Sequence, residues 1–209
     1  MGTFGGAIFV YGDGFQLVRS WLTDNPIEVA FMVVVYPNKL FVTFSDNSAQ
    51  LLELPSLTLL ALLGSNWITN RNEKITTVYV DEAGQLPFAF VGTSEGVVSV
   101  LDLSGPFSIR LCDYVISWKT IGLKFAYQVT DIQIYPKDEK YLAISYDSIT
   151  SSAGHVVIFD LTKQKPYRSY DTTNAIVSLA WQHQGDMLFA GELFSRDAFM
   201  SAASFSADE

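Results

Sequence analysis

The chain has 209 residues, 49% of them hydrophobic and 14% aromatic, and its net charge at pH 7 is −9. This composition can bury a core and argues against a disordered chain. The negative charge argues against nucleic acid and the bare surface of an anionic membrane as partners, and the longest apolar run, residues 29–36, is far shorter than the roughly 20 residues that cross a bilayer.

Strand patterns fill the chain, as short apolar runs rich in Val, Ile, Phe and Tyr that are separated by Gly, Pro, Asn and Asp. No segment has a convincing helical period. In chain order the predicted strands are 7–11, 15–20, 27–36, 40–45, 49–54, 57–63, 75–80, 87–93, 97–103, one within 109–118, 129–135, 141–146, 155–161, 166–170, 175–181 and 187–190. Longer loops are predicted at 104–128 and 148–153.

One short pattern recurs four times: a tight turn, an apolar strand and, in most copies, an acidic residue with Leu. Its anchors are Gly6, Asn47, Gly96 and Gly154, which are 41, 49 and 58 residues apart. A period of about 40–45 residues, stretched by loops, is typical of a β-propeller blade. The fold class is therefore predicted as all-β, a partial WD-repeat β-propeller. We expect about three complete four-stranded blades over residues 1–191, with incomplete blades at both ends.

The sequence offers no convincing catalytic or metal site. The two histidines, His155 and His183, lie far apart and have no paired Cys or His at ligand spacing, so we interpret both as structural or solvated. Gly12–Gly14 has no following helix that could hold a phosphate and is interpreted as a hairpin turn. Cys112 is the only cysteine, which suits a reducing cytosol. We expect no enzyme activity, no cofactor and no metal.

Acidic residues recur at strand ends. They could act as paired catalytic carboxylates, but their regular spacing favours turn capping and hydrogen bonds between blades. These residues are Asp46, Asp102, Asp147 and Asp160.

A few residues are candidate contacts for a protein partner. Lys163, Lys165 and Arg168 cluster around one hairpin and could attract an acidic patch, although solvation of an exposed turn explains them more simply. Trp21 and Trp67 lie at loop edges, where an exposed Trp can be a binding hot spot. Trp118 and Trp181 are interpreted as buried strand aromatics. A Ser-rich loop, 148–152, is a weak candidate for phosphorylation.

Three stretches carry a family resemblance. Residues 2–12, residues 107–119 and, most closely, residues 175–185 resemble the N-terminal propeller of the lethal giant larvae/tomosyn family of WD-repeat proteins. Residues 167–171 are slightly more similar to tomosyn. No repeat carries the usual combination of a Gly-His and a Trp-Asp dipeptide.

The resemblance implies a non-enzymatic scaffold that binds syntaxin-type plasma-membrane SNAREs and regulates vesicle exocytosis, and in some members cell polarity. It implies a cytoplasmic protein that is peripheral to the plasma membrane through its protein partners, without inserting into the membrane. The alternative is a generic propeller adaptor for another protein in trafficking or protein turnover.

The end of the sequence departs from the family pattern. After Gly191 the family would continue with a turn and another strand, whereas residues 192–209 diverge, so we expect this tail to lie outside the fold. Because about three blades cannot close a ring, we expect these residues to be a fragment that is unstable alone.

Overall fold

The structure is a computed structural model. It describes residues 5–22, 26–68, 70, 72–81, 86–123, 127–182, 184–185, 187–193 and 198–204. His183 lies outside these described residues.

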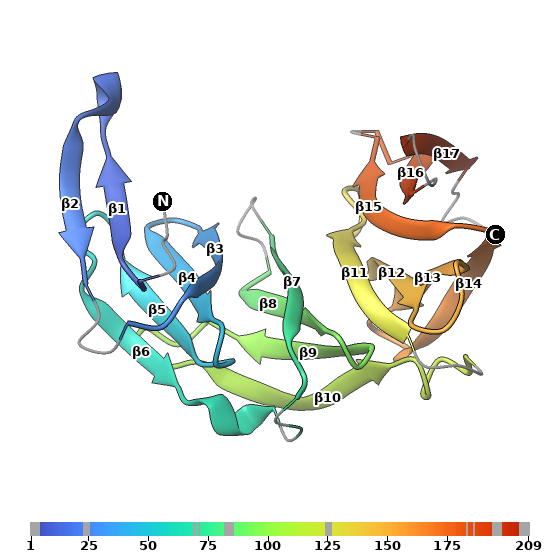
Figure 1. Cartoon of the computed structure of the whole chain (residues 1–209), viewed down its shortest axis with the longest axis horizontal. Helices are drawn as coiled ribbons and strands as arrows, with labels where there is room; N and C mark the ends of the chain where they lie inside the picture. Colours follow the sequence, from blue (N-terminus) through green and yellow to red (C-terminus); the bar gives the residue numbers. More distant parts are fainter. Residues whose placement is uncertain are drawn as a thin grey trace. The chain divides into compact units, whose positions relative to one another are not determined.

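The described chain forms five antiparallel sheets whose strands follow one another in chain order (Figure 1). Two short 3₁₀ turns, η1 (Asp13–Phe15) and η2 (Ser65–Trp67), lie between strands. The strands are β1 (Ile8–Tyr11), β2 (Leu17–Trp21), β3 (Val29–Val35), β4 (Lys39–Phe44), β5 (Ala49–Glu53), β6 (Leu59–Leu63), β7 (Ile75–Val80), β8 (Phe88–Thr93), β9 (Val97–Asp102), β10 (Arg110–Ser117), β11 (Tyr127–Ile134), β12 (Tyr141–Ser148), β13 (Gly154–Asp160), β14 (Lys165–Thr172), β15 (Ala175–Trp181), β16 (Met187–Leu193) and β17 (Ala198–Ser204).

Three of the sheets are complete blades. They are β3-β4-β5-β6, β7-β8-β9-β10 and β11-β12-β13-β14, each with four strands that we call a to d in chain order. β1 and β2 form a two-stranded sheet before them, and β15, β16 and β17 form a three-stranded sheet after them. This arrangement confirms the predicted fold class, with three complete blades and an incomplete one at each end.

The described chain divides into two compact units. The first comprises Met1–Phe90 with Val100–Asp113, and the second comprises Val91–Ser99 with Tyr114–Glu209. Each unit contains an apolar cluster that joins neighbouring sheets, and the two clusters are described separately below.

Irregularities in strand pairing recur at equivalent places in different blades. In the c–d pairs, a single extra residue interrupts the register of strand d at Val18, Leu60 and Tyr167. In the a–b pairs, strand a carries an extra residue at Ala30, Thr130 and Val177. The extra residue of a β-bulge bends its strand and increases the local twist. The bulge at Val18 identifies β1 and β2 as strands c and d, as the sequence predicted.

Strand b of each blade is almost fully buried, because other strands pair with both of its edges and apolar side chains cover its faces. In β4, Phe41 and Val42 are completely buried, and in β12 the same holds for Leu142 and Ile144. Continuous apolar runs are the sequence signature of strands covered on both faces. This explains why these segments show no alternation of polar and apolar residues.

One apolar cluster in each unit packs an incomplete blade against a complete one. In the first unit, Ile8 of β1 packs with Val42, Phe44 and Leu52 of the following blade. In the second unit, β15 and β16 pack against the blade β11–β14, and the buried residues of this cluster are Tyr135, Tyr141, Ala143, Val156, Ile158, Ile176, Leu179, Leu188 and Ala190. Apolar packing therefore joins an incomplete blade to a complete one in each unit.

The structure differs from expectation at two places. We expected residues 192–209 to lie outside the fold, yet β17 (Ala198–Ser204) pairs antiparallel with β16 along its whole length. A strand edge can pair with an extended segment of almost any sequence, so β17 can pair with β16 although its sequence departs from the family pattern. The interpretation of Trp118 as a strand aromatic was wrong, because β10 ends at Ser117 and Trp118 lies in the following turn.

A half-buried carboxylate joins two neighbouring blades in the second unit. Asp131 of β11 accepts a hydrogen bond from the backbone N–H of the buried Leu179 in β15, at 2.7 Å. Burial raises the pKa of Asp131 above its ordinary value, while hydrogen bonds from Leu179 and Ile132 oppose that rise. Burial thus disfavours the negative charge of the Asp131 carboxylate, whereas its oxygen, as a hydrogen-bond acceptor, makes the contact between the blades.

Replacing Asp131 tests this contact. We expect Asp131→Ala to lower the free energy of unfolding by about 1–3 kcal/mol, because it leaves the Leu179 N–H buried without its acceptor. Asp131→Asn keeps an oxygen at the same place and should cost clearly less. Equilibrium unfolding in urea measures both variants. Equal losses for the two variants would show that the hydrogen bond does not carry the effect.

Candidate protein-binding site

The turn between β4 and β5 is held by several hydrogen bonds. Asn47 adopts a left-handed backbone conformation, with φ +66°, and its N–H donates to the carbonyl of Phe44 at 2.9 Å. Asn tolerates this conformation better than most residues other than Gly. The Asp46 carboxylate accepts hydrogen bonds from the N–H and hydroxyl of Ser48, at 2.9 and 2.6 Å. The sequence at this turn therefore fixes its shape locally.

Two contacts from the connection between β6 and β7 hold the same turn. The Asn47 side-chain amide is buried and donates to the carbonyl of Glu73 at 2.7 Å. The indole N–H of Trp67, in η2, donates to the carbonyl of Asn47 at 2.7 Å. Asn47, predicted as a repeat anchor, and Trp67, predicted as a partner contact, thus lie together, and the polar group of Trp67 binds within the chain.

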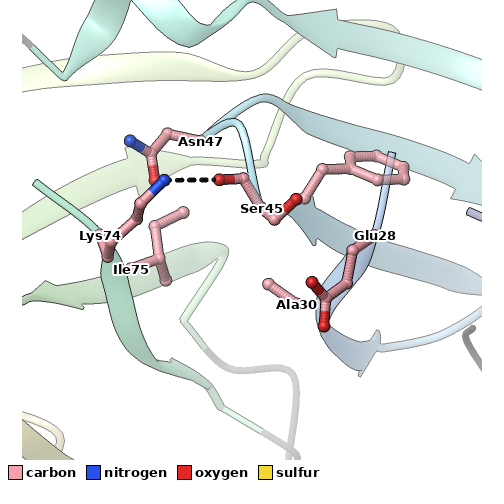
Figure 2. Close-up of a pocket in the computed structure, with 7 residues that line it drawn as sticks. Glu28, Ala30, Ser45, Asn47, Lys74 and Ile75 are labelled. Carbon is pink, nitrogen blue, oxygen red and sulfur yellow. Dashed lines mark hydrogen bonds between the residues drawn. The ribbon is translucent and has the colours of Figure 1, made fainter. Parts of the chain in front are cut away.

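An open hollow of about 400 Å³ lies beside this turn (Figure 2). Its walls come from the start of β3, the β4–β5 turn and the start of β7. The lining residues are Glu28, Ala30, Phe44, Ser45, Asn47, Lys74 and Ile75. Figure 2 shows Lys74 and Asn47 on one side of the hollow and Glu28 and Ala30 on the other.

The hollow carries one positive and one negative side chain. The Lys74 ammonium is exposed and donates to the carbonyl of Ser45 at 3.1 Å, and the Glu28 carboxylate lines the opposite side. Among the described residues that line the hollow, these two are the only ionisable ones, and Phe44 and Ile75 add apolar surface. Such a surface can bind a polypeptide through an acidic group, a basic group and an apolar contact.

The part of the chain that the structure describes shows no cluster of three or more His, Cys, Asp or Glu side chains that could hold a metal ion. Its helical segments include none that is long and apolar enough to cross a membrane.

The predicted basic contacts lie elsewhere, in the second unit. Lys163 is exposed and pairs with the buried Asp160 carboxylate at 3.4 Å. Lys165 begins β14 and is exposed, and the Arg168 guanidinium lies 5.5 Å from the centre of the Tyr167 ring. These basic side chains follow one another along one hairpin but do not join the hollow, which belongs to the first unit. Their role as partner contacts stays a prediction.

The remaining predicted aromatic contact, Trp21, ends β2 and packs in the first apolar cluster. Its ring lies 6.4 Å from that of Phe44. Trp181 ends β15 and packs in the second cluster, 5.1 Å from the ring of Tyr135. Both rings are half-buried.

Most of the recurring carboxylates accept hydrogen bonds within turns. Asp102 accepts from the Ser104 N–H at 2.8 Å, and Asp160 accepts from the Thr162 N–H at 3.0 Å. The hydrogen bonds from Ser104 lower the pKa of Asp102. Asp147 differs, because it accepts from the side chain of Gln128 on the neighbouring strand of the same blade, at 3.3 Å. The blade-to-blade bond is made by Asp131, a residue that the sequence pattern did not single out.

The sequence reasoning missed the residues that give the hollow its charges. Glu28 and Lys74 belong to no motif, and they become neighbours only because the first strands of two successive blades lie side by side.

The sequence reasoning also missed the role of Trp118. Trp118 follows β10 and donates its indole N–H to the carbonyl of Glu95 at 3.1 Å, so it holds the β8–β9 turn much as Trp67 holds the β4–β5 turn. The sequence signal that could have identified this role is a Trp shortly after strand d of a blade, as at Trp67 and Trp118.

The indole hydrogen bond of Trp67 can be tested by substitution. We expect Trp67→Phe to lower the free energy of unfolding by about 0.5–1.5 kcal/mol, because the ring remains while the donor to Asn47 is lost. Trp21→Phe is the control, since the Trp21 ring packs against Phe44 while its indole N–H has no hydrogen bond among the described residues. Urea unfolding followed by far-UV circular dichroism compares the two. A Trp67 variant as stable as wild type would contradict the role of this bond.

Solved structures of WD40 β-propellers resemble the chain, whereas no family model matches it. The β-propeller domain of Cps50 (Swd1) from Myceliophteria thermophila has a TM-score of 0.67 at 12% identity, over 100% of this chain and 64% of that one. A chain of a Mitotic Checkpoint Complex has a TM-score of 0.74 at 13% identity, over 98% and 58%. The C-terminal WD40 domain of Sif2 has a TM-score of 0.67 at 14% identity, over 97% and 53%.

These likenesses agree with the strand order of the sheets and identify the fold as that of a WD40 β-propeller. The chain spans between about half and two thirds of the length of these proteins.

Proposed function

We propose that this chain belongs to a non-enzymatic scaffold that binds a protein partner through the hollow beside the β4–β5 turn. The observation that carries the proposal is the hollow itself. Backbone-anchored turns form it, and it presents an ammonium, a carboxylate and apolar surface to solvent. A preorganised surface of this kind loses little conformational freedom when a partner binds.

We further propose that the partner is a plasma-membrane SNARE of the syntaxin type, and that binding regulates vesicle exocytosis. The support is the resemblance of residues 2–12, 107–119 and 175–185 to the lethal giant larvae/tomosyn family, together with the WD40 fold. The last of these stretches includes β15, a strand that packs between blades. On this proposal the protein lies in the cytoplasm and reaches the plasma membrane through its partner.

Charge reversal in the hollow tests the proposal. We expect Lys74→Glu to weaken capture of the purified cytoplasmic segment of a syntaxin by about tenfold or more, because it places two carboxylates on facing walls and removes the only ammonium there. The capture uses the full chain at matched protein concentration, and the bound fraction is measured across a titration.

Lys119→Glu is the matched control, because Lys119 is an exposed lysine that does not line the hollow. We expect it to bind like wild type. Loss of binding in both variants would show a general charge effect and would contradict the hollow as the site. No syntaxin binding by the wild-type chain would overturn the SNARE proposal and leave an adaptor for another protein as the function to be tested.

A further inference from the structure

The hairpin between β13 and β14 carries a local excess of positive charge in an acidic chain. Three of the thirteen Lys and Arg residues fall between Lys163 and Arg168, whereas the net charge of the whole chain is −9. The c–d turns of the other two complete blades, residues 54–58 and 103–109, contain no charged residue, and neither does strand β6. Solvation of an exposed turn and protection of an outer strand therefore do not require these cations.

The β-bulge of β14 places Lys165 and Arg168 on the same face of the sheet. Lys165 pairs with Asp160 at the start of β14. Arg168 pairs with Ile158, because the extra residue Tyr167 interrupts the register. Paired residues of antiparallel strands lie on the same face, and so do residues two apart along one strand. The two cations, three residues apart in the sequence, are therefore neighbours on the face that carries Asp160.

Two further lysines reach the same face. The Lys163 ammonium lies 3.4 Å from the buried Asp160 carboxylate. Lys140, in the a–b turn of the same blade, is held beside the hairpin because its carbonyl accepts a hydrogen bond from the Leu161 N–H at 2.8 Å. The Lys140 ammonium lies 5.1 Å from the centre of the Tyr141 ring, and Tyr141 pairs with Asp160. We call these four residues the basic cluster: Lys140, Lys163, Lys165 and Arg168.

The Asp160 side chain fixes the backbone of the turn that carries the cluster. Its Oδ1 atom accepts hydrogen bonds from the N–H and hydroxyl of Thr162, at 3.0 and 2.6 Å, and from the N–H of Lys163 at 2.9 Å. Gln164 completes the turn in a left-handed conformation, with φ +53°. The backbone positions from which the lysine stems project are thus set before a partner arrives, which lowers the entropic cost of binding.

The acidic groups around the basic cluster do not neutralise it. Asp160 is a single buried carboxylate, and its pairing is with Lys163. The adjoining a–b turn, residues 137–140, carries two lysines and two acidic residues, and Asp138 accepts a hydrogen bond from the Lys140 N–H within that turn, at 3.0 Å. Residues 137–140 and 160–168 together hold five basic and three acidic residues, which leaves a net charge of +2.

We propose that the basic cluster binds a short acidic segment of a partner protein. Ammonium groups attract carboxylates, and a guanidinium can bind one through two parallel hydrogen bonds. A nucleic acid duplex or an anionic membrane is a poorer match, because a large polyanion also meets the rest of a chain whose net charge is −9. Salt limits charge interactions to about 8–10 Å, so a short segment responds to the cluster alone. The cluster lies in the second unit, so this proposal does not rest on the hollow of the first.

Fluorescence anisotropy of a labelled peptide, in which glutamates alternate with threonines, tests the proposal with the full chain. The control ligand has glutamine in place of every glutamate. We expect only the acidic peptide to bind, with an affinity that falls about fivefold or more between about 50 and about 300 mM salt. Equal binding of the two peptides, or no binding of the acidic peptide at low salt, would overturn the proposal. Tighter binding to vesicles rich in phosphatidylserine or to a DNA duplex would overturn a polypeptide as the occupant.

Charge removal locates the binding site. Lys163→Gln combined with Lys165→Gln should weaken binding of the acidic peptide by about tenfold or more. Lys74→Gln combined with Lys119→Gln is the matched control, since it changes the net charge equally at two exposed lysines outside the cluster. We expect the control to bind like wild type. Equal weakening in the control, or weakening in the control alone, would show that the peptide does not bind at the basic cluster.

A single substitution separates binding from folding. Lys163 pairs with Asp160, so its replacement also affects the turn, whereas Lys165 is exposed at the start of β14. Lys165→Glu should weaken binding of the acidic peptide by about fivefold or more while the circular dichroism spectrum stays that of wild type. A folded Lys165→Glu variant that binds the peptide like wild type would contradict the proposal.

Discussion

Replacing Gly96 by Ala is expected to lower the free energy of unfolding by more than 2 kcal/mol, on the order of the cost of left-handed strain and overpacking combined. Gly96 has φ +70°, a backbone conformation that an L side chain rarely adopts. A Cβ atom at this position would also collide with the backbone carbonyl of Tyr127 and with the ring of Trp118. The carbonyl belongs to β11 and cannot yield without disturbing strand pairing. Urea unfolding measures the loss.

Gly122→Ala separates the two causes. An Ala at Gly122, which has φ +84°, would suffer the same conformational strain, but no atom of the described residues lies within 4 Å of the place of its Cβ. We expect Gly122→Ala to cost only about 1–2 kcal/mol, the cost of the left-handed conformation. If the two variants lose equal stability, the crowding at Gly96 has no energetic effect.

Replacing Tyr146 by Ala is expected to lower the free energy of unfolding by about 3–5 kcal/mol, as for other large aromatic residues truncated in a core. Tyr146 lies in β12, is completely buried and meets the ring of Tyr127 edge-on, with centroids 6.4 Å apart. Its hydroxyl has no hydrogen-bond partner among the described residues. Tyr146→Phe should therefore be neutral or slightly stabilising, because it removes only the hydroxyl. A large loss in Tyr146→Phe would contradict this account.

Tyr146→Phe is also expected to differ from wild type in the pH dependence of its stability. Burial raises the pKa of Tyr146, and burial raises the pKa of the nearby Tyr114 to about 12. An unfolded tyrosine ionises near pH 10, so above that pH the unfolded state releases protons that the folded state keeps. Stability is then fully present below about pH 10 and falls as the pH rises toward 12. Tyr146→Phe should lose less stability over this window than wild type.

The positions of the strands could be predicted from the sequence because each blade is defined by local patterns. β7 and β15 have the predicted bounds, and most others differ by one or two residues at their ends. The anchors Gly6, Asn47 and Gly96 share a left-handed conformation, with φ between +66° and +72°. This backbone requirement restricts the turn to Gly and Asn, and it is what the repeat pattern detected.

Gly154 was aligned with these anchors, but the structure gives it another role. It lies in β13 opposite Asp147, since the longer 148–153 loop makes the reversal before it. Gly is needed there because a Cβ would lie 2.6 Å from the Asn174 carbonyl and 2.8 Å from Ile176. This crowding depends on the next connection in the chain, so a single-repeat pattern cannot distinguish it from a turn glycine.

The candidate site could be predicted only in part, because some of its residues meet only through contacts between separate parts of the chain. Asn47 and Trp67 carried a signal because a turn residue and an isolated Trp are visible in the sequence. Glu28 and Lys74 carried none, since an exposed Glu or Lys beside a strand is common. Glu28 and Lys74 line one hollow only because β3 packs beside β7, and this packing is visible only in the folded chain.

The bulge shared by β2, β6 and β14 makes the c–d hairpins interchangeable modules. Because the extra residue falls at the same step of each ladder, at Val18, Leu60 and Tyr167, the paired parts of the hairpins correspond although their sequences and turn lengths differ. A hairpin moved into another blade would keep the pairing with strand b, but it would also replace buried side chains, since every residue of β13 is buried. Exchange of these hairpins would therefore change the packing between blades as well as the surface, while the strand pairing of each blade stays the same.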